Sequence, residues 1–498
     1  MPSFDKGAIV THAAYGRGTV LATRHRGLEV QVSFGRFRLW MPERELAPVR
    51  SGLRLVEETH APSKPPADAA GDATADESSL DQLMGILYGK GGVPSVPPAE
   101  TPPEVPVQEP RFTPTLPGRD MDQASAIEAL RLGLVPTTHI DHWTVGRTWE
   151  IGRIRDFLRD WTEGAILIEG AYGAGKSHLL RYLGRDAAEQ GYAVASAGFD
   201  PSEATAAFPK KAFRRLVQGF CMTVGGETLT FRPFLRAVAR HPHWEDVLGD
   251  HPLLSFLLHR LAKGREDEET WEWIEARWTG RRPLPTLHDY STCANIYCNL
   301  LSGLSRAAVE LLGMSGLLLL LDEAEIARNT IYRYQVQRGL NFFRGLILTA
   351  NDDPILLDED IVPGNPTTGL ETGLIYSAHN KTRYTTAIPS YLKVAFALTP
   401  GTLQSEFRRY RESIAVIELD ILNAEQLHDL FDRILQTFAA VYGTTLSPRG
   451  RDRVFHLIML SGRVSTTRGF IKAVVEAMDF CRFNPRGDVE RLITQGSA

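Results

Sequence analysis

The chain has 498 residues, of which 43% are hydrophobic and 23% charged, and its formal net charge is -5 at pH 7. This length and apolar content predict roughly two to four globular domains with sizeable cores. The negative balance excludes a global attraction to nucleic acid, so any such contact requires a local basic surface.

The cysteine pattern and the hydropathy narrow the class of protein further. The four cysteines, at positions 221, 293, 298 and 481, show neither a Cys-x2-Cys pair nor the density of a disulfide scaffold. We interpret them as reduced core thiols of a cytoplasmic protein. The sequence has no apolar run near the roughly 20 residues of a membrane span, and its first residues, MPSFDKGAIV, are not typical of a signal peptide. We expect no membrane partner.

Residues 1–50 consist of short β-rich runs separated by glycine and charged turns, which predicts a small all-β barrel. Eight basic and four acidic residues give this module a balance of plus four. The order GAIVTHAAYGRGTV, LEVQVSFG and MPERELAPV resembles the Tudor-like barrel at the C-terminus of UvrD/PcrA-type helicases. The resemblance implies docking onto polymerase or repair proteins, or a place close to nucleic acid. A barrel that only tethers an unknown partner is the alternative.

Residues 51–119 are rich in Pro, Ala, Glu, Asp and Ser and nearly free of aromatic residues, which predicts a disordered linker. Within it, Ser79 to Tyr88 places Leu80, Leu83 and Leu87 on one face of a short helix. This motif is either a docking peptide for a partner groove or a sticky part of the linker.

From about residue 120 a second region begins with an amphipathic helix at Ala124–Leu134 and a further helix that starts at Ile151. The apolar run Ala165–Ile168 predicts a core strand, and GAYGAGKS follows it at 170–177. Glycines in this loop allow backbone N–H groups to converge on a phosphate, and the next helix directs its positive end at the same anion.

The loop has the Gly-x4-Gly-Lys-Ser form, in which Lys176 reaches the β and γ phosphates and Ser177 holds Mg2+. A glycine-rich turn that matches this form by accident is the alternative. The predicted nucleotide-binding residues here are Gly170, Ala171, Tyr172, Gly173, Ala174, Gly175, Lys176, Ser177 and His178.

A second apolar run begins at Gly316 and ends in the acids Asp322 and Glu323, which predicts a buried parallel strand with carboxylates at its carboxyl end. Asp322 then contacts the Mg2+ shell, and Glu323 acts as the general base that polarises the attacking water. An acidic helix cap after a core strand is the alternative.

Further core strands are predicted at Tyr192–Ser196, Leu392–Thr399 and Ile414–Leu419. The stretch from about 203 to 310 shows helical patterns, and residues 421–498 are helical as well. The long stretch between Glu325 and Leu392 indicates an inserted loop. Together the elements predict an α/β fold with a parallel sheet.

The phosphate loop, the Asp-Glu pair, the polar strand end at Thr399 and the helical C-terminal piece resemble AAA+ ATPases, over roughly residues 120–485. The segments IEALRLGLVP, VGRTWEI, GAYGAGKSHLL and LLLLLDEAE are similar to the ATP-binding proteins of bacterial BREX phage-defence systems, the BrxD-like group. The implied domains are a Tudor-like barrel at 1–50, a linker at 51–119, an AAA+ core at 120–420 with a helical insertion at about 203–310, and a helical lid at 421–498.

The resemblance also implies roles for single residues. It places Val145, Gly146 and Arg147 near the adenine. It makes Thr399 the sensor of the γ-phosphate and Arg468 a second sensor from the lid. Thr399 as a simple strand cap, and Arg468 as a surface residue, are the alternatives. Arginine fingers for a neighbouring subunit are assigned by position only, and the candidates are Arg383, Arg408 and Arg409.

Isolated aromatic and histidine residues give weaker signals. Trp271 and Trp273 lie among glutamates that repel a phosphate backbone, so core or subunit packing is favoured over base stacking. The histidines show no metal-ligand spacing, so we assign no metal beyond Mg2+.

Two functions remain after these steps. The first is an oligomeric AAA+ ATPase that binds ATP and Mg2+ and assembles on or regulates a nucleic-acid machine such as a DNA-bound helicase, in phage defence. The second is a nucleotide-stabilised scaffold without turnover that recruits partners through the N-terminal barrel.

Overall fold

The computed structural model describes residues 9–12, 16–24, 29–34, 37–42, 46–48 and 121–484, apart from 135, 137, 202–204, 225, 278–291, 329–331, 366, 377–381, 402–405, 408–413 and 462–464. The chain divides into two units, Met1–Pro110 and Arg111–Ala498. The linker motif at 79–88 and the finger candidates Arg408 and Arg409 lie outside the described residues.

The first unit contains one antiparallel sheet in the order β4-β3-β2-β1-β5. Its strands are β1 (Ile9–His12), β2 (Gly16–Arg24), β3 (Glu29–Phe34), β4 (Phe37–Pro42) and β5 (Leu46–Pro48). Four valines, Val10, Val20, Val30 and Val32, are almost fully buried. The predicted β-rich runs form strands, and β4 and β5 lie at the two edges of the sheet. The Tudor-like likeness stays a prediction.

The second unit is built on a seven-stranded sheet in the order β12-β6-β11-β10-β7-β8-β9. The strands are β6 (Ala165–Gly170), β7 (Tyr192–Gly198), β8 (Phe220–Val224), β9 (Glu227–Leu229), β10 (Gly316–Asp322), β11 (Leu392–Leu398) and β12 (Ile414–Leu419). The five strands from β12 to β7 are parallel. The predicted α/β fold class, with a mostly parallel sheet and many helices, is confirmed.

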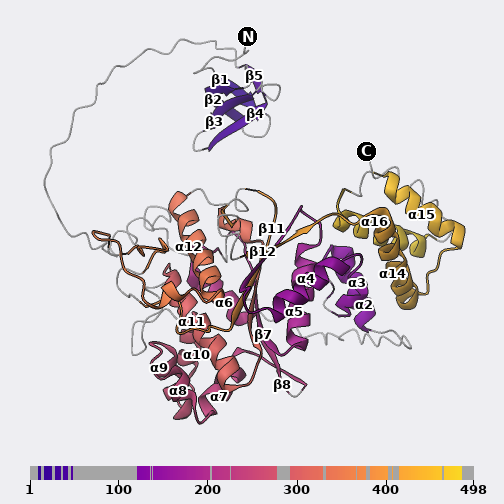
Figure 1. Ribbon diagram of the computed structural model, residues 1–498. Helices are drawn as coiled ribbons and strands as arrows, with labels where there is room; N and C mark the ends of the chain where they lie inside the picture. Colours follow the sequence, from indigo (N-terminus) through magenta and orange to yellow (C-terminus); the bar gives the residue numbers. More distant parts are fainter. Residues whose placement is uncertain are drawn as a thin grey trace, which may run out of the picture. The chain divides into compact units, whose positions relative to one another are not determined.

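Both faces of this sheet are covered, which explains why its strands are continuous apolar runs. In β10, Leu317, Leu319 and Leu321 pack into one hydrophobic cluster, whereas Leu318 and Leu320 pack into another on the opposite face. The second cluster contains α4 (Thr148–Arg159) and α5 (Lys176–Glu189). The first contains residues of α6 (Pro209–Gln218), α11 (Ala294–Arg306) and α12 (Arg333–Ala350). In Figure 1 these helices lie on the opposite side of the sheet from α4 and α5.

The insertion between β7 and β10 differs from the sequence prediction in one respect, because β8 and β9 are strands. In β8, Phe220 and Met222 are buried while Cys221 is half-buried and Thr223 exposed, an alternation typical of a strand with one covered face. The remaining elements are α7 (Phe231–Arg240), α8 (Trp244–Leu248), α9 (Leu254–Ala262), α10 (Glu268–Ile274) and the π-helical turn η4 (Ala307–Leu311).

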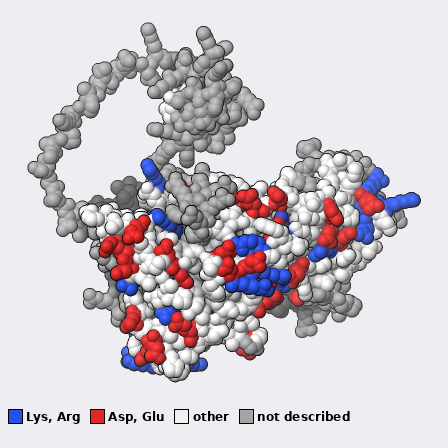
Figure 2. All heavy atoms as spheres, viewed as in Figure 1, with Lys and Arg blue, Asp and Glu red and all other residues white. Residues whose placement is uncertain are grey.

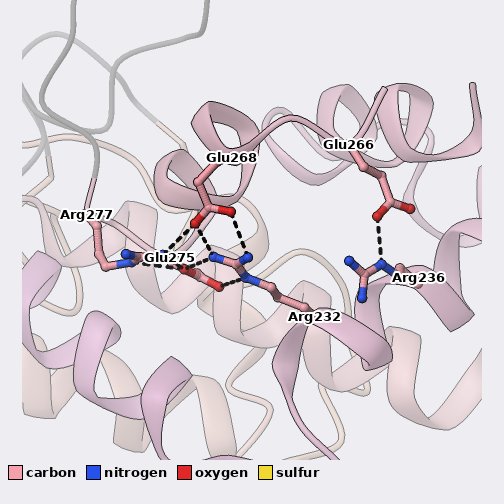
Figure 3. A network of polar contacts seen from close by, with 6 residues as sticks. All are labelled: Arg232, Arg236, Glu266, Glu268, Glu275 and Arg277. Carbon is pink, nitrogen blue, oxygen red and sulfur yellow. Dashed lines mark hydrogen bonds and ion pairs between the residues drawn. The ribbon is translucent and has the colours of Figure 1, made fainter. Parts of the chain in front are cut away.

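A network of ion pairs connects α7 to α10 and the residues beside it (Figure 3). Arg232 binds Glu268 and Glu275, and Arg236 binds Glu266. Both arginines also lie over the ring of Trp271, at 5.4 and 5.1 Å from its centroid. Trp271 and Trp273 are 2% and 1% exposed, so they are core residues, as the sequence favoured.

The helical lid forms a third hydrophobic cluster together with the first helices of this unit. Its elements are α2 (Met121–Leu132), α3 (Ile140–Trp143), α14 (Ala424–Tyr442), α15 (Pro448–Leu460) and α16 (Thr467–Phe483). Ile127 of α2 packs in the same cluster as Phe431 of α14 and Phe470 of α16. The elements α2, α3 and α14 lie next to one another in Figure 1.

The stretch between β10 and β11, predicted to be an inserted loop, instead contains the 18-residue helix α12 between the 3-10 turns η5 (Ala324–Arg328) and η6 (Pro354–Leu357). Of the four free cysteines, Cys298 is buried in the core, whereas Cys221, Cys293 and Cys481 are half-buried. Cys221 and Cys293 pack against the core clusters of the sheet. None of the helices within the described ranges is long and apolar enough to span a membrane.

Basic and acidic side chains are interspersed over the face shown in Figure 2.

Candidate functional site

A cavity lies at the carboxyl ends of β6, β10 and β11. Because β11 lies between β6 and β10, its end at Thr399 falls between the phosphate loop and the acids. The predicted site residues that line the cavity are Val145, Arg147, Tyr172, Gly173, Ala174, Gly175, Lys176, Ser177, His178, Asp322, Glu323, Thr399 and Arg468. Gly146, Gly170 and Ala171 were predicted too but do not line it.

The loop between β6 and α5 needs glycine at two positions. Gly173 and Gly175 have φ of 81° and 106°, a region that residues with a Cβ atom rarely adopt. A Cβ at Gly173 would also lie 2.7 Å from Cβ of Thr466, so the loop closely approaches the start of the lid helix α16. A Cβ at Gly175 would meet no atom within 4 Å, and Gly175 lines the cavity together with the first residues of α5, where helix N–H groups favour an anion.

The side chain of Lys176 is held by backbone carbonyl groups at the start of the phosphate loop. Its Nζ donates to the carbonyl oxygens of Gly170 and Ala171, at 3.0 and 3.3 Å, and the residue is only 8% exposed. Burial lowers the pKa of Lys176, while the carboxylates of Glu325, Asp322 and Glu323 oppose this shift. Lys176 and these three acids line the same cavity.

The two acids at the end of β10 have different environments. Asp322 accepts a hydrogen bond from the backbone N–H of Glu323 through Oδ1, at 3.0 Å. Glu323 has φ of 55°, an uncommon backbone conformation for this residue type that is typical of functional sites. Burial raises the pKa of the Glu323 carboxyl, and the neighbouring Asp322 and Glu325 raise it further. A carboxylate with a raised pKa is suited to accept a proton from water.

Thr399 does not face the cavity alone. Its hydroxyl donates to Oε1 of Glu325, at 2.7 Å, and both residues line the cavity. Glu325, in η5, is a cavity residue for which the sequence analysis predicted no role. Its position two residues after Glu323 in the Asp-Glu-Ala-Glu run was a signal that could have found it.

Arg468 reaches the cavity from the first turn of α16. Its guanidinium donates to the Tyr172 hydroxyl, at 2.6 Å, and lies 5.1 Å from the centroid of the Tyr172 ring. Thr467, beside it, also lines the cavity, and its Oγ1 is buried without a partner among the described residues. The lid and the phosphate loop thus meet directly at the cavity.

The Val145–Arg147 segment supports the site from another side. Arg147 donates to the carbonyl oxygens of Ala174 and Asp420, at 2.9 and 2.7 Å, and pairs with Glu150. It therefore joins the phosphate loop to the end of β12. Val145 is 5% exposed and contributes an apolar surface to the cavity wall.

Part of the cavity lining is apolar, and most of the residues in this part carry no local sequence signal. They come from α2, α3, α14 and α16 and the segments between them, and they are Leu130, Leu134, Pro136, Trp143, Leu422, Leu430 and Ile471. His178 lies here as well, with Nε2 2.7 Å from the Thr144 hydroxyl. Burial, with help from the charges of Arg147 and Arg181, lowers the pKa of His178 to about 4, so the ring is neutral at pH 7.

The oxygen atoms of Ser177 and Asp322 suit Mg2+, which prefers oxygen ligands and keeps several of its waters. Both residues line the cavity beside Lys176. Within the described ranges, no cluster of three or more His, Cys, Asp or Glu side chains could hold a metal ion without other ligands. A hydroxyl and a single carboxylate fit an ion that arrives with a phosphate ligand.

Comparison with known proteins locates the likeness in the segment that carries the phosphate loop. Residues 119–228 match the family described as BREX system ATP-binding protein BrxC/D. This segment is similar to the BrxC/D proteins. The resemblance predicted from the sequence is thereby confirmed over these residues, and the match supports an ATP-binding protein of the BREX kind.

No curated protein matches the chain. Among solved structures, AMPPCP-bound DnaA from Aquifex aeolicus is similar with a TM-score of 0.30 and 12% sequence identity, over 70% of this chain. The chain spans 65% of the length of that protein.

The finger candidate Arg383 is not among the residues that line the cavity.

Proposed function

We propose that the protein binds ATP with Mg2+ in this cavity and hydrolyses it. One observation carries the proposal, namely that Lys176, the acids at the end of β10 and Thr399 meet at a single cavity beside the phosphate loop. These residues come from three different strand ends, so their meeting is a property of the fold and not of a local motif. The match of residues 119–228 to BREX ATP-binding proteins supports the same conclusion.

In this proposal each residue has a defined task. The loop glycines and the start of α5 bind the phosphates, and Lys176 adds a positive charge at the β and γ phosphates. Ser177 and Asp322 hold Mg2+, which neutralises phosphate charge when it is bound. Glu323 orients the attacking water and takes its proton. The apolar part of the lining, together with Val145, receives the base.

The biological setting follows from the resemblance and stays part of the proposal. We assign the protein to a BREX-like defence system, in which it assembles into a homo-oligomer and regulates a DNA-bound machine such as a helicase. The proposed domains are the barrel at 1–50, the linker at 51–119, the AAA+ core at 120–420 with its insertion, and the lid from 421. We also propose that the protein is located in the cytoplasm.

ATP turnover tests the proposal directly. We would measure phosphate release by the wild type, Lys176→Ala and Glu323→Gln, with and without duplex DNA, together with ATP binding and mass in solution. The expected result is that Lys176→Ala loses binding and turnover, whereas Glu323→Gln keeps binding and loses turnover by at least about 100-fold. Lys211→Ala, a change at a lysine that does not line the cavity, is the control.

The competing function is a scaffold that nucleotide stabilises but that does not turn it over. A wild type that binds ATP without releasing phosphate, with and without DNA, supports this scaffold and contradicts the ATPase. A wild type that binds no ATP contradicts both. The presence of Lys176, Asp322 and Glu323 in the lining of one cavity favours the enzyme.

A further inference from the structure

The hydroxyl of Thr399 has one proton, and the structure shows where it goes. A threonine hydroxyl can donate one hydrogen bond and accept two. In this protein it donates to Oε1 of Glu325, at 2.7 Å. A phosphate oxygen is an acceptor only, so Thr399 cannot donate to a γ-phosphate and to Glu325 at the same time.

Glu325 is placed so that this competition has consequences for the site. It lies in η5, directly after the acid-tipped strand β10, and it lines the cavity. Its second oxygen, Oε2, is buried and has no hydrogen-bond partner among the described residues. Loss of the Thr399 hydrogen bond would therefore leave both oxygens of a partly buried carboxylate without a donor, which is unfavourable.

We propose that Glu325 is a specificity-determining residue, which competes with the γ-phosphate for the Thr399 proton and thereby sets the preference of the site for ATP over ADP. The inference rests on the proposed function, because it requires nucleotide in the cavity. ADP has no γ-phosphate and leaves the pair intact. ATP gains the Thr399 hydrogen bond only by breaking the one to Glu325.

The variant Glu325→Gln tests the competition without removing the side chain. An amide oxygen can still accept from Thr399, but a neutral acceptor binds the proton more weakly than a carboxylate. The γ-phosphate then obtains the Thr399 proton at lower cost. We expect the ratio of the ADP Kd to the Kd of a non-hydrolysable ATP analogue to rise by about five- to tenfold.

A matched control separates this effect from simple removal of negative charge. Glu323→Gln also removes a carboxylate from the cavity, but that side chain makes no hydrogen bond to Thr399. Both Kd values would be measured by calorimetry with Mg2+ on the full chain. The proposal expects the Glu325→Gln ratio to exceed the Glu323→Gln ratio. Equal ratios for the two variants would overturn it.

A double-mutant cycle tests whether the effect acts through Thr399. In a Thr399→Val background the hydroxyl is absent, so Glu325→Gln should change the ratio no more than Glu323→Gln does. In a Thr399→Ser background the hydroxyl is retained, and the larger effect should return. An effect of Glu325→Gln that persists in Thr399→Val contradicts the proposal. A wild type that binds neither nucleotide contradicts the proposed function instead.

Discussion

At the scale of single residues, the pair of Tyr172 and Arg468 connects the phosphate loop to the lid. The pair combines a 2.6 Å hydrogen bond with the stacking of a guanidinium over an aromatic ring. Each interaction contributes on the order of 1 kcal/mol at such a site. Tyr172 is 66% exposed, so its ring has little other packing to maintain.

This pair predicts a graded response to substitution of Tyr172. Tyr172→Phe keeps the ring and loses the hydroxyl, so nucleotide affinity should fall by about threefold to tenfold, and Tyr172→Ala should cost more. In an Arg468→Ala background, Tyr172→Phe and Tyr172→Ala should have the same nucleotide affinity, because the partner of the tyrosine is absent. Calorimetry on these variants is the measurement, and Tyr332→Phe, at another exposed tyrosine, is the control. Unchanged affinity in Tyr172→Ala would show that the pair has no role in binding.

His251 makes a separate prediction, about stability and pH. Its ring is 1% exposed, and Nδ1 accepts from the backbone N–H groups of Leu253 and Leu254. Burial lowers the pKa of His251 from 6.5 to about 4. The stabilising contribution of the neutral ring is therefore complete above pH 6.5 and is lost as the pH falls toward 4, since the unfolded chain takes up the proton first.

Between pH 7.5 and pH 5 this single histidine should lower the free energy of unfolding by about 2 kcal/mol. His251→Asn should be less stable at pH 7.5 but should show a correspondingly smaller loss on acidification. Urea unfolding followed by tryptophan fluorescence at the two pH values provides the test. His243→Asn, a change at an exposed histidine, should keep the full pH dependence. The same slope in His251→Asn and the wild type would refute this account.

Sequence could predict those site residues that are neighbours along the chain. The loop at 170–177 and the acids after β10 follow strands directly, so their position at the sheet edge follows from local pattern. The partners of Thr399 and Arg468 could not be found in this way. Glu325 is 74 residues from Thr399, and Tyr172 is 296 residues from Arg468. Only the strand order and the packing of the lid bring these pairs together.

At the scale of elements, α14 begins with a capping box that also fixes the segment before α4. The side chain of Asn423 accepts from the N–H of Gln426, and the Gln426 side chain accepts from the N–H of Asn423. Nε2 of Gln426 then donates to the carbonyl oxygen of Gly146, at 3.2 Å. The start of the lid is thereby attached to the Val145–Arg147 segment.

Gly146 is the residue on which this attachment depends. It has φ of 64°, and a Cβ at this position would lie 2.4 Å from the end of the Gln426 side chain. Gly146→Ala should therefore lower stability by about 1–2 kcal/mol, through backbone strain and loss of the Gln426 contact. Gly152→Ala is a matched control, because this glycine lies in α4 with no atom within 4 Å of a Cβ.

The two alanine variants should move in opposite directions. Gly152→Ala should stabilise the protein by about 0.5–1 kcal/mol, since alanine is the better helix former. Thermal unfolding of the two variants and the wild type is the measurement. A Gly146→Ala protein as stable as the wild type would show that the Gln426 side chain moves away without cost.

Elements also show where pattern reasoning fails. The strand β8 is five residues long and lies inside a stretch of helical patterns, and its alternation covers only Phe220 to Thr223. Such a short run gives little periodicity to detect, and the strand forms because its neighbour β7 offers an edge at Val194 and Ala195. The packing of α2 in the lid cluster could not be predicted from the sequence either. It depends on contacts between residues more than 300 positions apart, such as Arg131 with Asp479.

At the scale of the whole second unit, the hydrophobic clusters form a sheet part and a lid part, and both parts line the cavity. Two clusters cover the faces of the sheet, and a third joins α2 and α3 to the lid. The cavity is lined from both sides, by Lys176 and Asp322 on the sheet side and by Leu130 and Arg468 on the lid side. A ligand that contacts both sides will resist their separation.

Hydrogen exchange can detect this coupling. With a non-hydrolysable ATP analogue and Mg2+, we expect amide exchange to slow in α16 and also in α2, although most of α2 lies outside the cavity, because both belong to the lid cluster. The insertion helices α7 to α10 should exchange as before, since none of their residues line the cavity. Protection restricted to the phosphate loop would mean that the lid moves independently of bound nucleotide. Protection of α16 without α2 would mean that the lid cluster does not act as one body.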